Sequence, residues 1–155
     1  GAAHFIAGDA PDLQAELDRL NRLAAAIPVD GAFIGIGENG HLAFNDPPAD
    51  FDVEDPFIVV ILDEACRWQQ FGEGWYASLE DVPRQRISMS IKQILRSRSI
   101  VCTVPDARKA RAVKACLEGE IGPMFPASIL RRHSRCFLFL DRDSAGALSP
   151  GTLAG

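Results

Sequence analysis

The chain has 155 residues, of which 47% are hydrophobic and 24% charged, and its formal net charge is −5. This length suits one domain with a real core, and the composition is ordinary for a soluble globular protein. The acidic balance argues against nucleic acid or an anionic membrane as the main partner. No apolar run approaches a membrane span and no signal peptide is recognisable, so a cytoplasmic protein is expected.

Four cysteines occur without a Cys-x-x-Cys pair, at positions 66, 102, 116 and 136. We expect them to be free, buried thiols in a reducing compartment. The three histidines do not stand at ligand spacing with the cysteines, so neither a metal site nor a cofactor is expected.

The first part of the chain predicts a strand, a helix and a second strand. Residues 3–7 favour a strand, and Asp9 and Asp12 are spaced as the cap and reciprocal acid of a helix. Apolar side chains of that helix recur at helical spacing: Leu13, Leu17, Leu20, Ala24 and Ile27. The apolar run at residues 32–34 then predicts a short buried strand that ends near Ile36.

Strand and helix patterns alternate through the rest of the chain. Residues 57–62 form a continuous apolar run, which is typical of a strand in a sheet buried on both faces. Further strands are expected at residues 86–89, 99–104 and 137–140. Helices are expected at residues 63–71, 91–96, 106–117 and 128–132. The alternation predicts a single α/β domain over residues 1–155, with a doubly wound parallel sheet and helices on both of its faces.

Glycines and polar groups gather just after the strand at residues 32–34. The stretch reads Gly35-Ile36-Gly37-Glu38-Asn39-Gly40-His41-Leu42-Ala43-Phe44-Asn45-Asp46-Pro47-Pro48. Its glycines let the backbone turn sharply and approach a ligand, and Pro47 holds the backbone of Asp46 extended. Ligands of parallel α/β folds gather at the carboxyl ends of strands, so His41 is expected in a cleft there. A plain turn beside a structural histidine is the alternative.

This stretch resembles the signature of the glucosamine-6-phosphate deaminase/isomerase family. That signature reads Gly-(Ile/Val)-Gly-x-(Asp/Asn)-Gly-His-(Ile/Leu)-(Ala/Gly)-Phe-Asn-(Glu/Asp)-Pro. The related 6-phosphogluconolactonases share the glycines and the histidine but usually continue with Ala-Ser-Leu-Phe-Pro. Phe44 and Asn45 therefore favour the deaminase side. Further blocks of the family follow in order, at residues 79–83, 108–110 and 126–130.

The resemblance implies a Rossmann-like, sugar-phosphate isomerase-like fold and a hydrolase/isomerase activity. An amino-sugar 6-phosphate, such as glucosamine 6-phosphate, would be converted to a ketose phosphate and ammonia. His41 is implied to open the sugar ring, which suits imidazole because it titrates near neutral pH. Asn39 and Asp46 are implied to hold its second nitrogen. Both depart from the commonest residues of the family, which are acids and, at the second position, the longer glutamate.

Substrate contacts are also implied by the resemblance, at Gly35, Ile36, Gly37, Ala43, Arg67, Gln70 and Lys109. The family's phosphate-binding arginine falls at Gln70, and Arg67 one turn earlier is a candidate substitute. Lys109 lies near a helix N-terminus, which suits a phosphate, but a solvated lysine in a basic stretch is an equal alternative. His133 is interpreted as a structural histidine.

Residues 1–34 contain no Ser/Thr/Gly-rich phosphate loop and no match to the family's general-base aspartate. The resemblance therefore implies that the N-terminal part of the family fold is absent, and that this chain alone has little activity. Two alternatives stay open: a 6-phosphogluconolactonase-like hydrolase, and a non-catalytic sugar-phosphate-binding module. The expected partner is a small sugar phosphate, and a homo-oligomer is left open.

Overall fold

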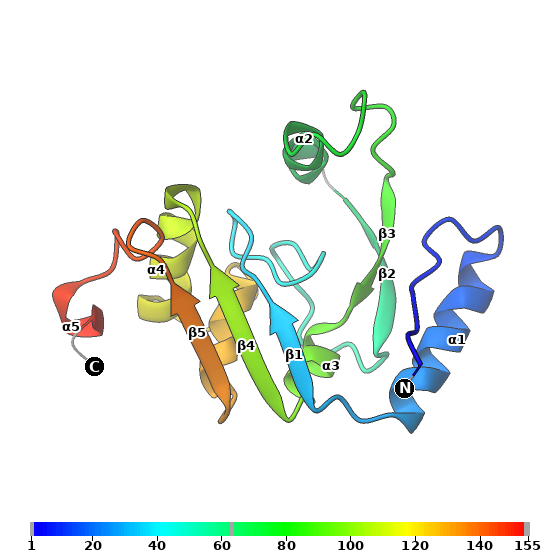
Figure 1. Ribbon diagram of the computed structural model, residues 1–155, viewed down its shortest axis with the longest axis horizontal. Coiled ribbons are helices and arrows are strands. Elements are labelled where there is room, and N and C mark those ends of the chain that lie inside the picture. Colours follow the sequence, from blue (N-terminus) through cyan, green and yellow to red (C-terminus); the bar gives the residue numbers. More distant parts are fainter. Residues whose placement is uncertain (1, 63, 154–155) are drawn as a thin grey trace.

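A three-stranded parallel sheet lies at the centre of the computed structural model, which describes residues 2–62 and 64–153 (Figure 1). Its strands run in the order β1 (Gly31–Ile34), β4 (Ser99–Val104) and β5 (Cys136–Leu140). In the register, Phe33 lies opposite Val101. The parallel α/β architecture expected from the alternating pattern is confirmed.

A second, antiparallel pair stands apart from this sheet. It consists of β2 (Phe57–Ile61) and β3 (Gln85–Met89), which are joined through α2 (Glu64–Gly72). The expectation of a doubly buried strand at residues 57–62 is wrong, because Ile61 in β2 is 78% exposed. An apolar run marks a strand but does not say which strand will be its partner.

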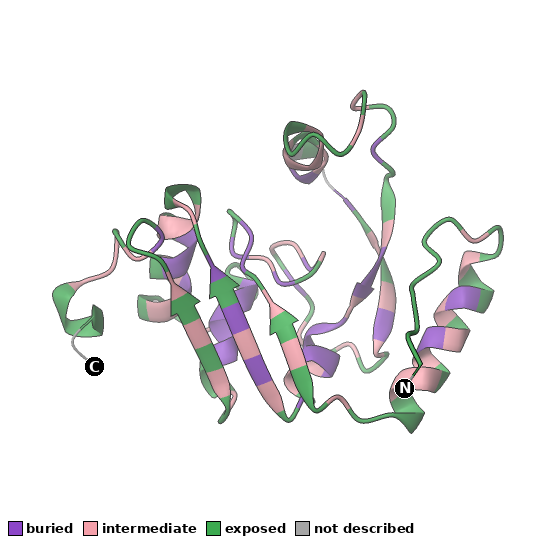
Figure 2. Ribbon diagram, in the orientation of Figure 1, coloured by how far each residue is buried: buried purple, intermediate pink, exposed green. Residues whose placement is uncertain are grey.

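Helices pack on one face of the parallel sheet: α3 (Ile91–Leu95), α4 (Ala110–Glu118) and η2 (Pro126–Arg132). The β4 side chains Ile100, Cys102 and Val104 are buried in this core. The other face presents exposed aromatic side chains, among them Phe33 and Phe137. Figure 2 shows exposed positions along the ribbons of β1 and β5. We expected helices on both faces of the parallel sheet. Among the described residues, helices cover one of its two faces.

Two expectations for the start of the chain are wrong. Residues 3–7 form no strand, although the Ala7 amide donates to Glu16. The first helix, α1 (Leu13–Ala26), is capped by Asp12, whose carboxylate accepts a hydrogen bond from the Ala15 amide at 2.9 Å. Asp9 was expected to be the cap, but it lies too far from the first turn because the helix begins only at Leu13.

The remaining helices lie close to their expected positions. The helix expected at residues 106–117 is built from η1 (Ala107–Lys109) followed by α4, and Asp106 caps its start. A short α5 (Pro150–Leu153) follows β5 near the end of the chain. Asp63, the first residue of the helix expected at residues 63–71, lies outside the described residues. Among the residues described, no helix is both long and apolar enough to cross a membrane.

The buried thiols are expected to react slowly with alkylating reagents. The four cysteines, all among the described residues, form no disulfide, and burial raises the pKa of Cys102 to about 12 and that of Cys116 to about 11. Since the thiolate is the nucleophile, both should be alkylated by iodoacetamide at pH 8 at least ~100-fold more slowly than in urea. Mass spectrometry of time points measures this. Equal rates in the native and unfolded chain would contradict the expectation.

Candidate functional site

The loop that follows β1 carries the candidate site. The strand ends at Ile34, two residues earlier than expected, and the chain then closes a tight loop at the carboxyl edge of the sheet. The Gly37 amide donates to the His41 carbonyl at 3.0 Å, and the Gly40 amide donates to the Gly37 carbonyl at 3.0 Å. Gly40 has a φ of +88°, a left-handed conformation that favours glycine. His41 therefore projects from a closed loop at the edge where ligands of such folds bind.

The imidazole of His41 lies directly against the backbone of Gly37. A Cβ at position 37 would stand 2.2 Å from Cε1, 2.3 Å from Nδ1 and 2.4 Å from Nε2 of the ring. No side chain fits there unless the ring moves. Glycine at this position thus sets where the imidazole can lie.

Two side chains hold one nitrogen of the ring. His41 Nδ1 lies 2.8 Å from the Asn39 side-chain oxygen and 3.1 Å from Asp46 Oδ1. The Asn39 amide in turn donates to Asp46 Oδ1 at 2.9 Å. Since both neighbours of Nδ1 are acceptors, the neutral ring carries its proton on Nδ1 and leaves Nε2 with a free lone pair. The geometry expected for Asn39 and Asp46 is met.

The Asp46 carboxyl stays ionised at neutral pH. Burial raises its pKa, but hydrogen bonds with His41 and Asn39, the charge of protonated His41 and a hydrogen bond from Cys66 together hold the pKa below its ordinary value. A carboxylate next to Nδ1 stabilises an imidazolium when the ring accepts a proton. The site can therefore accept and return a proton at Nε2.

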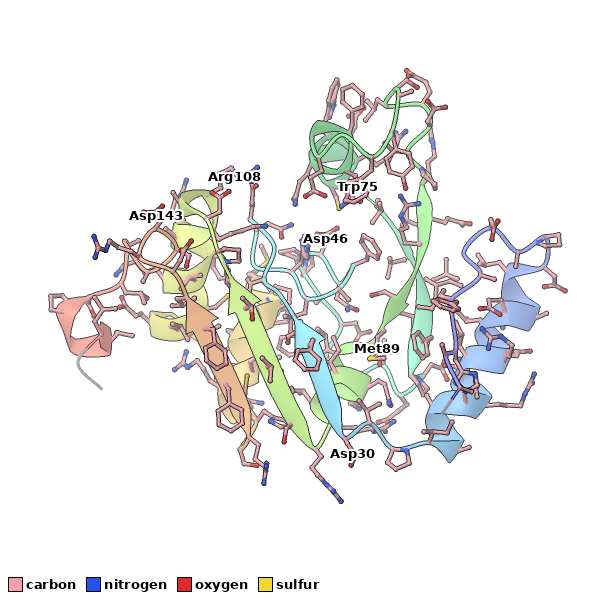
Figure 3. All side chains as sticks on the ribbon, viewed as in Figure 1. Asp30, Asp46, Trp75, Met89, Arg108 and Asp143 are labelled. Atoms are coloured by element: carbon pink, nitrogen blue, oxygen red, sulfur yellow. The ribbon has the colours of Figure 1, made fainter. Side chains whose placement is uncertain are left out.

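A second segment reaches the same edge from the end of β4. Arg108 of η1 contacts Glu38 of the loop after β1 at 3.4 Å and pairs with Asp106 at 2.8 Å. Figure 3 shows Arg108 and Asp46 at the same edge of the sheet, and Asp30 at the opposite one. Lys109 follows Arg108 in η1, which begins shortly after the carboxyl end of β4.

Helix α2 carries two residues that were expected to contact the phosphate, Arg67 and Gln70. Arg67 donates to the carbonyls of Val82 at 3.2 Å and Leu79 at 2.6 Å, so it anchors α2 to the connection before β3. Gln70 is half-buried on the same helix. The pair is not part of the hydrogen-bonded group around His41.

His133 is structural, as expected. Its Nε2 lies 2.8 Å from the Ser97 carbonyl, just before β4 begins. This is the amino end of the strand, opposite to the edge that carries His41.

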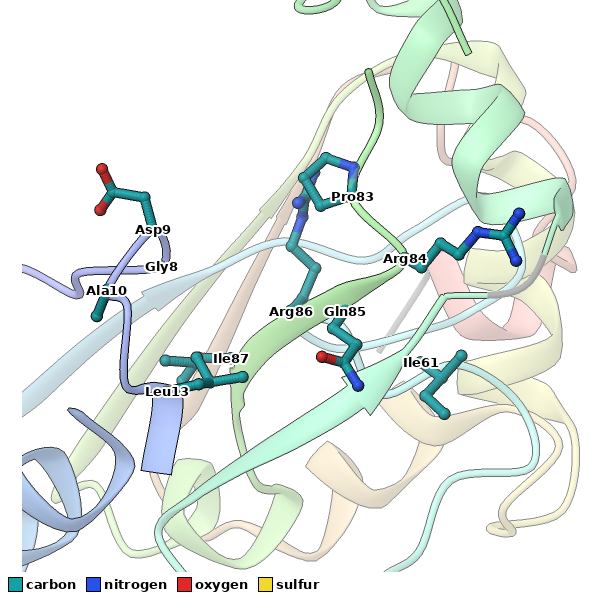
Figure 4. A pocket seen from close by; sticks show the side chains of 10 residues that line it. All are labelled: Gly8, Asp9, Ala10, Leu13, Ile61, Pro83, Arg84, Gln85, Arg86 and Ile87. Carbon is teal, nitrogen blue, oxygen red and sulfur yellow. The ribbon is translucent and has the colours of Figure 1, made fainter. Parts of the chain in front are cut away.

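A large open pocket lies away from this network. It measures about 880 Å³ and is lined by residues 8–10, Leu13, Ile61 and residues 83–87 (Figure 4). None of these residues bonds to His41, Asn39 or Asp46, so volume alone does not identify the site. Within the described part of the chain, no three histidine, cysteine or acidic side chains form a group that could hold a metal ion.

Comparison with known proteins decides the family. Residues 3–138 match the family described as glucosamine-6-phosphate isomerases/6-phosphogluconolactonase. The chain belongs to this family. The family resemblance stated from the sequence is confirmed, and the loop of residues 35–48, which carries that resemblance, is called the signature loop.

Several deaminases of the family are similar over most of the chain. Glucosamine-6-phosphate deaminase of Streptococcus uberis is 38% identical over 141 residues, which is 91% of this chain and 58% of the relative. The enzyme of Bacillus cereus is 37% identical over 142 residues, covering 92% of this chain and 53% of the relative. The chain thus spans little more than half the length of these relatives.

Solved structures agree on the fold. A monomeric glucosamine-6-phosphate deaminase has a TM-score of 0.81 at 36% identity, covering 90% of this chain and 56% of that one. 6-Phosphogluconolactonase from Trypanosoma brucei has a TM-score of 0.66 at 18% identity, covering 88% of this chain and 54% of that one. The second likeness concerns the fold alone.

Sequence reasoning missed several residues around the signature loop. Arg108 was noted only as part of a basic stretch and of the family block at residues 108–110, and its pairing with Glu38 was not foreseen. Ser88 was not singled out, although a serine between Ile87 and Met89 in an expected strand is a signal, because buried hydroxyls normally have partners. Cys66 was noted only as a thiol. Its contact with Asp46 was not foreseen, because Cys66 lies in α2 and Asp46 in the loop after β1.

Proposed function

We propose that this chain is part of an amino-sugar-phosphate deaminase/isomerase. The substrate is an amino-sugar 6-phosphate such as glucosamine 6-phosphate, and the products are a ketose phosphate and ammonia. The observation that carries the proposal is the His41 ring with Nδ1 held by Asn39 and Asp46, an arrangement that favours the tautomer with its proton on Nδ1. The deaminase relatives and the Phe44-Asn45 pair support it.

In this proposal His41 opens the ring of the sugar. Nε2 takes the proton of the anomeric hydroxyl, and the resulting imidazolium returns a proton to the ring oxygen as the carbon–oxygen bond breaks. Asp46 stabilises the imidazolium meanwhile, and its contact at 3.1 Å shows that the shorter aspartate reaches the ring. The C2 proton then moves to C1 while an amino proton passes to the aldehyde oxygen, so that C2 carries an imine. Water hydrolyses this imine to the ketone and ammonia.

The substrate contacts follow the signature loop. Gly35, Ile36 and Gly37 line the sugar with their backbone, and Ala43 of the same loop, held at a φ of +52°, joins them. Lys109 and Gln70 are proposed as phosphate contacts. Arg67 keeps a role in placing α2, since its guanidinium already donates to two carbonyls.

The C2-to-C1 proton transfer needs a second base, and we propose that it comes from outside these residues. The resemblance to the family assigns its base to no residue of this chain, and a base at the wrong distance loses orders of magnitude in rate. A cytoplasmic location, self-association and the absence of a cofactor stay predictions.

An ammonia-release assay on glucosamine 6-phosphate tests the function. We compare the 155-residue chain with a chimera that adds the part of the Streptococcus uberis relative outside the match. The chimera is expected to release ammonia, and the chain alone to release less than about 1% as much, because general acid–base groups must act together. In the chimera, His41→Ala should lower turnover by about 10²- to 10⁴-fold, as for loss of a general acid–base.

The same assay separates the alternatives. The exposed His4→Ala variant is the matched control and should keep full turnover. Hydrolysis of 6-phosphogluconolactone without ammonia release would favour the lactonase. Binding of the sugar phosphate by calorimetry, with turnover of neither compound, would favour a non-catalytic module.

A further inference from the structure

Asn45 ties the signature loop to β3. Its side-chain nitrogen donates to the carbonyls of Leu42 and Met89, both at 2.8 Å, and lies 3.2 Å from Ser88 Oγ. The residue is 6% exposed. The side-chain nitrogen of Asn45 carries two hydrogens and has three acceptors around it. Rotating the side-chain amide would therefore break these hydrogen bonds.

Ser88 has no hydrogen-bonding capacity left for chemistry. Its hydroxyl accepts from the Phe44 amide at 3.1 Å and from Asn45, and donates to the Met89 carbonyl at 3.2 Å. One donor and two acceptor positions are all that a hydroxyl offers. The side chain is 2% exposed, so water does not compete for these bonds. Ser88 therefore acts by holding its neighbours.

A second side chain of β3, that of Arg86, also contacts the signature loop. Arg86 lies two residues from Ser88, on the same face of the strand. Its guanidinium carbon lies 5.8 Å from the centre of the Phe44 ring and 5.6 Å from that of Tyr76, and it donates to the Tyr76 hydroxyl at 2.6 Å. Strand β3 thus contacts both residues that immediately precede Asp46.

These contacts join two separate sheets. The signature loop follows β1 of the parallel sheet, whereas Ser88 belongs to the antiparallel pair. The backbone of Asn45 leads directly into Asp46, so its position decides whether the carboxylate reaches His41. We propose that Ser88 is a positioning residue for the His41 site, holding Phe44 and Asn45 so that Asp46 stays against the imidazole.

This inference deepens the proposed function of the same site, and its test does not depend on turnover. The protein is the 155-residue chain labelled with ¹⁵N, and the readout is the tautomer of His41 together with exchange of its Nδ1 proton with water. In the unsubstituted chain a single tautomer with a protonated Nδ1 is expected. In Ser88→Ala, both tautomers should appear, and the Nδ1 proton should exchange at least about tenfold faster, as for loss of a buried hydrogen bond.

Three further variants make the result specific. Ser88→Thr keeps the hydroxyl and should restore exchange to within about twofold, since the hydrogen bonds remain. Asn45→Ala removes the partner of the same bond and should reproduce the Ser88→Ala spectrum. Ser97→Ala is the matched control, since Ser97 is a buried serine just before β4, and it should leave the His41 signals unchanged.

The outcomes are decisive. Unchanged His41 signals in a folded Ser88→Ala chain would overturn the proposal. So would an equal change in Ser97→Ala, since it would mean a general loss of packing. If Ser88→Thr does not fold, the comparison of Ser88→Ala with Asn45→Ala still decides. The ammonia assay can fail with these signals intact, so failure of the proposed function is recognised separately.

Discussion

Replacing Gly37 by alanine should abolish the proposed chemistry and leave the fold almost intact. A Cβ there would stand 2.2 to 2.4 Å from three atoms of the His41 ring, so the ring must leave Asn39 and Asp46. The side chain can swing away while the backbone stays, so the stability loss should be only about 1 kcal/mol, typical of a mild substitution. Turnover of the chimera should fall by about 10²- to 10⁴-fold, as for loss of a general acid–base.

Urea unfolding and the ammonia assay measure the two effects. Gly31→Ala is the matched control, since a Cβ at position 31 meets nothing within 4 Å. It should leave both quantities nearly unchanged. Full turnover in Gly37→Ala would show that the ring need not lie where the structure has it.

Leu42→Ala is expected to give the largest loss of stability. This side chain is fully buried in the main core although it belongs to the signature loop. Removing it leaves a cavity, and such substitutions cost roughly 2–5 kcal/mol of unfolding free energy. The loop should loosen as well, because the Leu42 carbonyl accepts both the amide and the side chain of Asn45.

Urea denaturation of the 155-residue chain gives this number directly. The exposed Leu153→Ala variant is the control and should change the unfolding free energy by less than about 0.5 kcal/mol, as for surface substitutions. A loss below about 1 kcal/mol in Leu42→Ala would mean that the loop is not part of the core.

Patterns in the sequence predicted those helices, strands and loops that depend mainly on contacts between residues close together in the chain. Helical spacing located α1, and the glycine-rich loop after a short strand located His41 at the carboxyl edge of the sheet. The cap of α1 was predicted three residues too early. Asp9 and Asp12 have the same type of side chain, and which of them caps the helix depends on where the helix begins. The extended segment at residues 3–7 shows the same limit, since its apolar residues meet no partner strand.

The family and the α/β alternation could be predicted from the sequence. The group of Asn39, His41 and Asp46 could be predicted as well, because all three sit in one loop a few residues long. The pairing of β2 with β3 as a separate antiparallel pair, and the hydrogen bond of Ser88 in β3 to the loop after β1, could be seen only in the folded chain. Phe44 and Ser88 are 44 residues apart in the chain. Residue types show which groups can bond, but which distant groups meet depends on how the whole chain packs, and no local pattern records that.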